Sequence, residues 1–347
     1  MKPSLYQYSL AGLETLVAER GWKKYITRQL VQWLYQKKVS SFAEMSDLSK
    51  EIRAQLEKDF SIDPLHVVEK QSSTDGTTKF LFNLSDDKKI EAVFIPSEKR
   101  TTLCLSTQVG CAMACTFCRT GEMKLQRNLT LEEIVGQVLV VARSFPSITN
   151  LVFMGMGEPM ANLPTLLDAL AILKHPNGCG FSKNKITVST SGVVPKMYEF
   201  VKQSEVKLAV SLHAPNDALR TQLMPINKRY PLKDLMQFCR EYRGHNRRHR
   251  ITFEYVMLKG VNDSLVQCKE LVRLLEGVPS KINLIPFNPF PGNDFHPSPE
   301  ETIKEWVDQL MRAGIQTNVR KDRGRDILAA CGQLAYLNLM TTSPSRM

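Results

Sequence analysis

The segment Thr101-Thr-Leu-Cys-Leu-Ser-Thr-Gln-Val-Gly-Cys-Ala-Met-Ala-Cys-Thr-Phe-Cys118 joins a predicted β-strand to a loop that holds three cysteines. Residues 102–107 are mostly β-branched or apolar, as is typical of a strand. In the loop, Cys111, Cys115 and Cys118 have the spacing C-x3-C-x2-C. A short loop with these gaps can wrap three thiolates around one compact ion or cluster. The segment therefore predicts a metal centre at the exit of a strand.

Three thiolates favour an iron–sulfur cluster at this centre. A [4Fe–4S] cluster held by three cysteines keeps one iron open. An open iron can bind S-adenosylmethionine and deliver the electron that splits its sulfonium. Structural zinc is the alternative, and it requires four closed ligands. Cys104 is the nearest fourth candidate, but it lies in the predicted strand, seven residues before Cys111.

Strands and helices alternate from Thr101 onward. The predicted strands are residues 102–107, 149–154, 185–190, 206–212, 251–258 and 281–286. The first helix between them opens with the capping box Thr130-Leu-Glu-Glu133. Six such alternations imply parallel strands joined by right-handed crossovers. The sequence therefore predicts an α/β fold with a partial (β/α)6 TIM-like barrel.

Unusual sequences rich in Gly, Pro, Ser or Cys follow each predicted strand. In α/β barrels the working residues lie on the loops at the carboxyl ends of the strands. We therefore expect six loops to surround one site. These loops are 110–118, 155–159, 189–192, 211–215, 259–262 and 287–290.

The N-terminal part of the chain has a different pattern. Apolar residues recur at helical spacing through residues 1–60, whereas 66–96 reads as short strands around the turn signal Asp75-Gly76. The expected parts of the chain are 1–96, a small α+β accessory domain; 97–340, the barrel with a C-terminal extension; and 341–347, a flexible tail. The longest apolar stretches are interrupted within ten residues, which is too short to cross a bilayer. Nothing at the N-terminus marks the chain for secretion, so disulfides are disfavoured and a cytoplasmic location is expected.

The chain carries a surplus of positive charge. Forty-six Lys and Arg against 35 Asp and Glu give a net charge of +11 and a pI near 9.2. Such a surplus suits a polyanionic partner, because neutralised phosphates release counterions. A generically basic, soluble protein is the alternative that charge alone leaves open.

Longer motifs narrow the class of protein. Together with the cysteine triad they resemble the RlmN family, dual-specificity adenine-C2 methyltransferases of ribosomal and transfer RNA. The resemblance covers nearly the whole chain, including residues 41–49. The motifs are Gln108–Cys118, Met154–Pro159, Ser211–Asp217, Met224–Asn227, Asn283–Gly292 and Ala329–Leu334.

The resemblance implies a mechanism that uses two molecules of S-adenosylmethionine per turnover. Cys331 accepts a methyl group from the first molecule, and a radical from the second removes hydrogen from that methyl group. The resulting methylene radical adds to C2, a carbon too electron-poor to attack a sulfonium itself. Cys104 is expected to help break the adduct and to form a disulfide with Cys331. Glu91 matches a glutamate assigned as proton acceptor, although Cys104 could take the same proton.

The resemblance also assigns contacts with S-adenosylmethionine. These residues are Gly157, Glu158, Ser189, Ser211, Leu212, His213 and Asn288. A glycine lets the backbone approach a ligand, and a carboxylate accepts hydrogen bonds from an ammonium group. Without the resemblance, a lone His213 would be read as a core histidine, and Cys104 and Cys331 as buried thiols. The family usually has Cys-Ala-Thr-Gly after the triad, where this chain has Cys118-Arg-Thr-Gly121.

The implied partners are 23S rRNA, tRNA and an external, flavodoxin-like electron donor; no membrane is expected, and the protein is expected to be a monomer. The accessory domain is expected to contact RNA, and the target adenine must be flipped out to expose C2.

Two basic segments could follow a phosphate backbone. One holds Arg240, Arg243, Arg247, Arg248 and Arg250, with a solvated helix end and loop as the alternative. The other is Arg320–Arg325, which precedes Cys331.

Three other functions remain open at this stage. A related methyltransferase that acts on C8 of adenine shares the cysteine apparatus. A radical enzyme acting on protein, such as a glycyl-radical activase, is disfavoured by the positive charge and by the Cys104/Cys331 pair. A zinc-stabilised RNA-binding module is the non-enzymatic alternative.

Overall fold

The computed structural model describes residues 2–63, 65–242 and 250–335. Its main feature is one curved sheet in which the order of the strands is β1-β2-β3-β4-β7-β8-β9-β10-β11-β12. The strands up to β4 pair antiparallel, and those from β4 to β12 pair parallel. Among the described residues no pairing joins β1 to β12, so the barrel is open on one side. The partial α/β barrel expected from the sequence is therefore confirmed.

The strands of the large sheet have the following bounds: β1 His66–Ser72, β2 Thr78–Asn83, β3 Lys89–Ser97, β4 Arg100–Cys104, β7 Asn150–Phe153, β8 Ile186–Thr190, β9 Lys207–Ser211, β10 Ile251–Met257, β11 Ser280–Pro286 and β12 Gln316–Val319. All six barrel strands expected from the sequence are present. A further parallel strand, β12, was not predicted, because Gln-Thr-Asn-Val is short and largely exposed. A separate two-stranded sheet consists of β5 Gln108–Val109 and β6 Arg127–Asn128.

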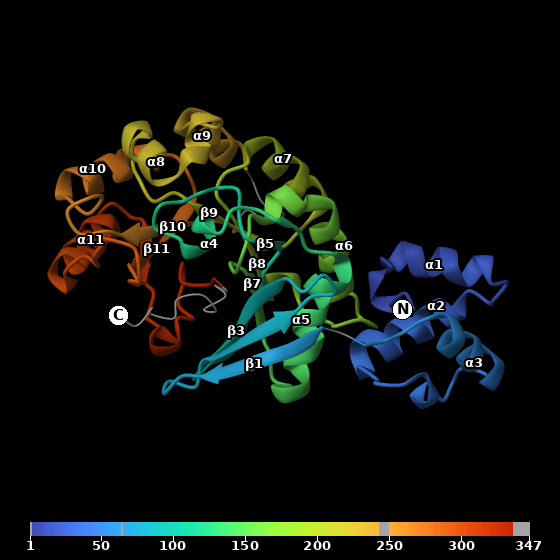
Figure 1. Ribbon diagram of the computed structural model, residues 1–347. Helices are drawn as coiled ribbons and strands as arrows, with labels where there is room; N and C mark the ends of the chain where they lie inside the picture. The colour runs from blue at the N-terminus through green and yellow to red at the C-terminus, as the bar shows by residue number, and fades with distance from the viewer. Residues whose placement is uncertain (1, 64, 243–249, 336–347) are drawn as a thin grey trace, which may run out of the picture.

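Helices cover the outer side of the curved sheet, as Figure 1 shows for α6 to α11. Their bounds are α4 Arg119–Glu122, α5 Leu131–Ser144, α6 Leu163–Lys174, α7 Val194–Gln203, α8 Asp217–Leu223, α9 Leu232–Glu241, α10 Leu265–Leu274 and α11 Glu300–Arg312. The predicted capping box is confirmed at α5, where the Thr130 hydroxyl accepts from the Glu133 N–H and the Glu133 carboxylate accepts from the Thr130 N–H. The cap satisfies backbone donors that a helix end otherwise leaves unpaired.

Three helices precede the sheet: α1 Leu10–Glu19, α2 Tyr25–Val31 and α3 Lys50–Asp59. They bury apolar residues such as Leu13, Leu30 and Leu56 and pack beside α5 and α6. The expected accessory domain, residues 1–96, also included the short strands predicted within 66–96. In the structure these strands are hydrogen-bonded to β4 and extend the barrel sheet. The expected tail, residues 341–347, lies outside the described part of the chain.

The two faces of the barrel strands differ sharply in polarity. Outward side chains such as Leu151, Val188 and Phe253 are fully buried under the helices. The inward positions, two residues apart on each strand, are mostly polar. They include Thr102 and Cys104 in β4, Thr187 and Ser189 in β8, Lys207 and Ser211 in β9, Thr252 and Glu254 in β10, and Lys281 and Asn283 in β11. The barrel interior is therefore hollow and polar instead of being filled by branched side chains.

The chain after β12 closes the open side of the barrel. The Gly324 N–H donates to Asp75 Oδ2 at 3.1 Å, and the Ser73 hydroxyl donates to Asp326 Oδ1 at 2.6 Å. Ser73 and Asp75 lie in the turn between β1 and β2. Figure 1 shows this red C-terminal segment beside the tip of the blue hairpin. The segment thereby spans from one edge of the sheet to the other.

Candidate active site

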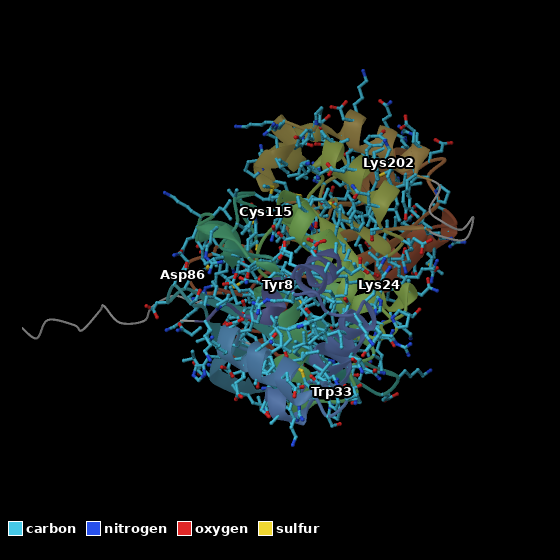
Figure 2. All side chains as sticks on the ribbon, turned by 90° about the vertical axis from the view of Figure 1, so that its right-hand side faces the viewer. Tyr8, Lys24, Trp33, Asp86, Cys115 and Lys202 are labelled. Carbon is cyan, nitrogen blue, oxygen red and sulfur yellow. The ribbon has the colours of Figure 1, made fainter. Side chains whose placement is uncertain are left out.

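Two adjoining cavities lie in and above the barrel. The smaller, of about 170 Å³, is lined by Cys111, Cys115 and Cys118 together with strand-exit loops. The larger, of about 600 Å³, occupies the barrel interior and reaches Cys104. Cys331 lines both cavities. In Figure 2 Cys115 lies on the barrel, away from Trp33 of the N-terminal helices.

The three cysteines of the triad share one environment. Burial raises the pKa of Cys111 to about 12, and it also raises the pKa of Cys115 and Cys118. The thiol of Cys118 contributes further to the raised pKa of both others, so the three sulfurs lie near one another. A metal centre that binds these thiolates must displace their protons.

The loop geometry depends on Gly110. This residue has a φ of +74°, and a Cβ there would meet the Lys124 carbonyl oxygen at 1.8 Å. No side chain fits, because a real Cβ contact never comes so close. The glycine thus lets the chain turn back directly before Cys111.

This donor set fits a cluster with an open iron. Cys104, the fourth thiol that zinc would require, lines the larger cavity and not the smaller one. Among the described residues no group of three His, Cys, Asp or Glu side chains is compact enough for a single metal ion. Cys331 also lines the smaller cavity, but it comes from the C-terminal segment and its sulfur accepts from Arg320. The cluster loop itself therefore presents three thiols in one cavity wall.

Glu158 is fixed in the wall of the smaller cavity by the loop after β7. Its Oε1 accepts from the Met160 N–H at 3.0 Å and its Oε2 from the Ser191 N–H at 2.7 Å. Gly157, with φ +100°, packs so tightly that a Cβ would lie 2.5 Å from the Gln108 side chain. Burial raises the pKa of Glu158. Each oxygen keeps a lone pair that can accept from an ammonium group in the cavity.

His213 lies at the exit of β9 with its ring in the cavity wall. Its Nδ1 accepts from the Val256 N–H at 2.9 Å, which leaves the proton of the neutral ring on Nε2. The ring also stacks edge-on against Phe117 at 4.6 Å. Burial, together with the charge of Arg220, lowers the pKa of His213 to about 3. The histidine is therefore a neutral hydrogen-bond donor and not a cation.

Three further cavity-lining residues have polar groups available. Ser189 and Ser211 end β8 and β9, and both line the smaller cavity. Asn288 lines both cavities, and its buried Oδ1 has no hydrogen-bond partner. The hydroxyl of Ser191, which the sequence did not single out, is also buried without a partner. Such orphaned groups are costly unless a polar ligand satisfies them.

Two predicted site residues lie elsewhere. Leu212 is fully buried in the hydrophobic core and lines neither cavity. Glu91 lies in β3 and lines neither cavity, and its Oε1 is 3.0 Å from Lys79 Nζ. Burial raises the pKa of Glu91. The register pairs Val93 with Cys104, so Glu91, two residues before Val93, is on the same face of the sheet as Cys104.

Cys331 and Cys104 are brought together from opposite ends of the barrel domain. Burial, together with the charge of Cys331, raises the pKa of Cys104 to about 12. Both cysteines are unbridged. The Cys331 side chain is exposed, whereas Cys104 is buried. The two sulfurs face the same cavity from β4 and from the C-terminal segment.

Arg320 belongs to the basic segment 320–325 that was expected to follow a phosphate backbone, but it contacts Cys331 instead. Its Nη1 donates to Cys331 Sγ at 3.0 Å, and its Nη2 to Met154 Sδ at 3.1 Å. Glu254 Oε1 lies 3.5 Å from the same Nη2 and also accepts from Asn283 at 2.9 Å. Glu254 raises the pKa of Arg320. Glu254 was not predicted as a member of this site.

Comparisons with known proteins agree with this geometry. A family model of the radical SAM superfamily matches residues 105–272, and one of the ribosomal RNA large subunit methyltransferase N-terminal domain matches residues 4–62. The chain is 49% identical to a dual-specificity RNA methyltransferase RlmN from Geotalea uraniireducens (strain Rf4), with 96% of each chain covered. It is 48% identical to one from Rhodopseudomonas palustris (strain BisA53), covering 96% of this chain and 89% of the relative.

A solved structure has the same fold throughout. It is that of a radical SAM methyltransferase from Sphaerobacter thermophilus, with a TM-score of 0.90 and 44% identity. The superposition covers 96% of this chain and 99% of that one. The similarity therefore includes the N-terminal helices, the barrel and the C-terminal segment.

Proposed function

The chain belongs to the RlmN family of radical S-adenosylmethionine methyltransferases, and from this premise we propose that it methylates C2 of an adenine in 23S rRNA and in tRNA. The observation that carries the proposal is the position of Cys331. This residue lies where the triad cavity meets the barrel cavity, with Arg320 on its sulfur. A methyl carrier must reach both the methyl source and the RNA base, and this position offers both.

The cofactors are a [4Fe–4S] cluster, held by Cys111, Cys115 and Cys118, and S-adenosylmethionine. When bound, they supply an organic radical that can remove hydrogen from a methyl group. Glu158 is placed to accept from the methionine ammonium. Ser189, Ser211, His213 and Asn288 are placed to bind the ribose and the carboxylate. Gly157 lets the backbone approach, whereas Leu212 supports the loop from the core.

Cys331 acts as the methyl acceptor in this proposal. Its sulfur takes the methyl group from the sulfonium, and the new S–C bond forms as the sulfonium C–S bond breaks. The guanidinium of Arg320 donates to that sulfur at 3.0 Å and orients it in the cavity. After one hydrogen atom passes to the organic radical, the methylene carbon bonds to C2 and joins the enzyme to RNA. The adduct then loses one electron, which the cluster could take back, and the C2 proton, which a base of the chain takes.

Cys104 resolves that covalent adduct. Its sulfur faces the same cavity and can form a disulfide with Cys331 as the S–C bond to the product breaks. With a pKa of about 12 in its buried setting, Cys104 is a thiol before the reaction. Glu91 also has a raised pKa, and it is the second candidate for taking the C2 proton. Cys104 would first have to lose its own proton in order to take the one on C2.

The C8-directed methyltransferase is the alternative that shares these cysteines. Deletion of the gene, followed by nucleoside analysis of ribosomal and transfer RNA, tests the assignment. We expect 2-methyladenosine to disappear from both RNA pools and to return with the wild-type gene. Methylated adenosine at C8 made by the purified protein would overturn the proposed position.

We further propose that the protein takes electrons from an external, flavodoxin-like donor. We expect it to be a monomer and to be located in the cytoplasm. Among the described residues no helix is long and apolar enough to cross a membrane. The N-terminal helices are proposed to contact RNA, and their match with a ribosomal RNA methyltransferase N-terminal domain supports this.

A further inference from the structure

Cations gather at the amino ends of the barrel strands, opposite the cluster loop. Arg100 is the first residue of β4, Lys207 the first of β9 and Lys281 the second of β11. Lys185 directly precedes β8, and Arg250 directly precedes β10. Five of the seven parallel strands therefore begin beside a positive charge. Parallel strands bring these ends to one rim.

Four of these residues form one electrostatic group, which we call the basic rim: Arg100, Lys185, Lys207 and Lys281. Burial lowers the pKa of Lys207, and the charges of Lys281, Lys185 and Arg100 lower it further. Within residues 2–63, 65–242 and 250–335, no acid lies within ion-pair distance of any of the four. Like charges held together without counter-charges leave a strong positive potential for a partner to neutralise.

The basic rim is connected to the reaction site. Arg100, Lys207 and Lys281 line the same 600 Å³ cavity as Cys104 and Cys331. Arg100 and Lys207 are also exposed, so the cavity reaches the surface at the rim. Lys207 and Ser211 are four residues apart on β9, which corresponds to roughly 13 Å along the strand. A volume of this size is in the range of cavities that hold a ligand.

The wall between the rim and the cysteines is polar. Thr102, Asn150, Thr187, Thr252 and Asn283 face the cavity between the two ends. Hydroxyl and amide groups of this kind can bind the ribose and the edge of a flipped base. An apolar wall would instead exclude a nucleotide.

In the competing basic segment, residues 320–325, three of the four cations already lie beside acidic side chains. The fourth, Lys321, lines the same large cavity as the basic rim. Arg320 contacts Glu254 and Cys331, and Arg323 lies 3.8 Å from an Asp75 oxygen. Arg325 lies 3.8 Å from Asp322. In the other segment, Arg243, Arg247 and Arg248 lie outside the described residues. Of that segment, Arg250 is described and adjoins β10 at the basic rim.

We propose that the basic rim binds the RNA phosphates beside the target nucleotide, and that this nucleotide enters the barrel from the rim to reach Cys331. The inference rests on the proposed function and specifies which end of the barrel admits the RNA. The carboxyl end of the barrel is left to the cluster and S-adenosylmethionine, so that the two substrates approach Cys331 from opposite sides.

The first experiment measures the affinity of the holoenzyme for an unmodified tRNA transcript by fluorescence anisotropy across a salt series. The double variant Lys207→Gln/Lys281→Gln is compared with wild type and with Lys304→Gln, an exposed lysine on α11. Each lost phosphate contact reduces the slope of log K against log salt by about 0.7–0.9. We therefore expect the double variant to lose about 1.4–1.8 from the slope and to bind on the order of tenfold more weakly near 0.1 M salt.

Thermal melting and iron content show whether the double variant is folded and loaded. An unchanged slope and affinity in a folded double variant would overturn the inference, as would a loss confined to Arg325→Gln in the competing segment. Methylation by wild type is assayed separately. If wild type binds tRNA through the rim but does not methylate it, the proposed function fails while the binding surface stands.

A second experiment tests the direction of entry. Photoactivatable p-benzoylphenylalanine in place of Lys207 should crosslink to nucleotides that flank the target adenosine. The same group in place of Lys304 should not. Crosslinks to those nucleotides from position 325, with none from position 207, would contradict entry from the rim.

Discussion

At the scale of single residues, Arg320 places a charged hydrogen-bond donor on the sulfur of Cys331. The guanidinium lies 3.0 Å from the sulfur and is held in place by Glu254. Arg320 does not itself exchange atoms with a substrate, so its role is to position and polarise Cys331. A charged donor on the sulfur fixes the direction in which that sulfur presents itself to the cavity.

Arg320→Met should therefore slow methylation of Cys331, because the sulfur loses the charged hydrogen-bond donor that orients it. Loss of one such bond corresponds to roughly a tenfold slower rate. Mass spectrometry of the peptide that contains Cys331 measures the rate. Arg320→Lys should restore part of it, and Arg320→Met/Glu254→Gln controls for an uncompensated buried carboxylate. Equal methylation rates for Arg320→Met and wild type would rule out this role.

Cys104 and Glu91 can be separated by one substitution each. If Cys104 resolves the adduct, Cys104→Ala should accumulate enzyme joined covalently to RNA, visible as a shifted band on a denaturing gel. Glu91→Gln should turn over without such a band, because Glu91 lines neither cavity. A covalent band from Glu91→Gln, with none from Cys104→Ala, would reverse the two assignments.

His213 predicts a pH dependence of stability. Its pKa is about 3 in the folded chain against an ordinary 6.5, so the unfolded chain binds the proton first. The contribution is complete above pH 6.5 and is lost as the pH falls toward 3, by about 1.4 kcal/mol per pH unit. Urea unfolding between about pH 7 and pH 5 should show a shallower loss for His213→Asn, whose oxygen can replace Nδ1. The exposed His296→Asn should follow wild type, and identical slopes for all three proteins would contradict a neutral buried His213.

At the scale of elements, the turn between β1 and β2 holds the segment that carries Cys331. Asp75 accepts from the Thr77 N–H at 2.8 Å and from the Gly324 N–H at 3.1 Å. Asp75→Ala should loosen residues 324–335, so that hydrogen exchange there becomes faster and the turnover number falls. The matched control is Asp308→Ala on an exposed part of α11. Unchanged exchange in the peptides of 324–335 would show that the turn does not hold the segment.

Local patterns allowed most of the elements to be predicted from sequence. Alternating apolar residues marked the six barrel strands, and Thr130 with Glu133 marked the start of α5. Strand β12 was not predicted, because it is four residues long and mostly exposed. The short strands predicted within 66–96 were expected in a separate domain, because no local signal shows that β3 pairs with β4. Pairing across the sheet depends on tertiary contacts that periodicity does not contain.

The parts of the site that lie in contiguous motifs could also be predicted from the sequence, whereas contacts between distant segments could not. The cysteine triad and the strand-exit loops are contiguous motifs, and the structure brings them to one cavity. Arg320 and Glu254 carry no motif, and they become meaningful only when β10 and the C-terminal segment meet. The nearness of Cys104 and Cys331, 227 residues apart in the sequence, came from the resemblance alone.

At the scale of the whole molecule, the cluster loop and the C-terminal segment support each other. The Arg119 N–H donates to the Gly332 carbonyl at 2.8 Å, and the Thr120 hydroxyl to the Leu334 carbonyl at 2.5 Å. Removing the cluster with a chelator should therefore expose residues 320–335 to proteases and lower the melting temperature. Anaerobically purified protein should contain iron and sulfide before the treatment. Stoichiometric zinc without iron, or cleavage at the same rate after chelation, would contradict this coupling.

The hollow, polar interior of the barrel also bears on how such a protein can evolve. The outward side chains of each strand are buried under helices and carry the stability of the fold. The inward ones, only one residue away along the strand, contribute little to that core. A substitution at Thr187 or Asn283 can thus change what the cavity admits at small cost to folding. Substitutions on the inward face of the sheet could therefore change the substrate of a descendant protein, while selection kept the outward face nearly unchanged.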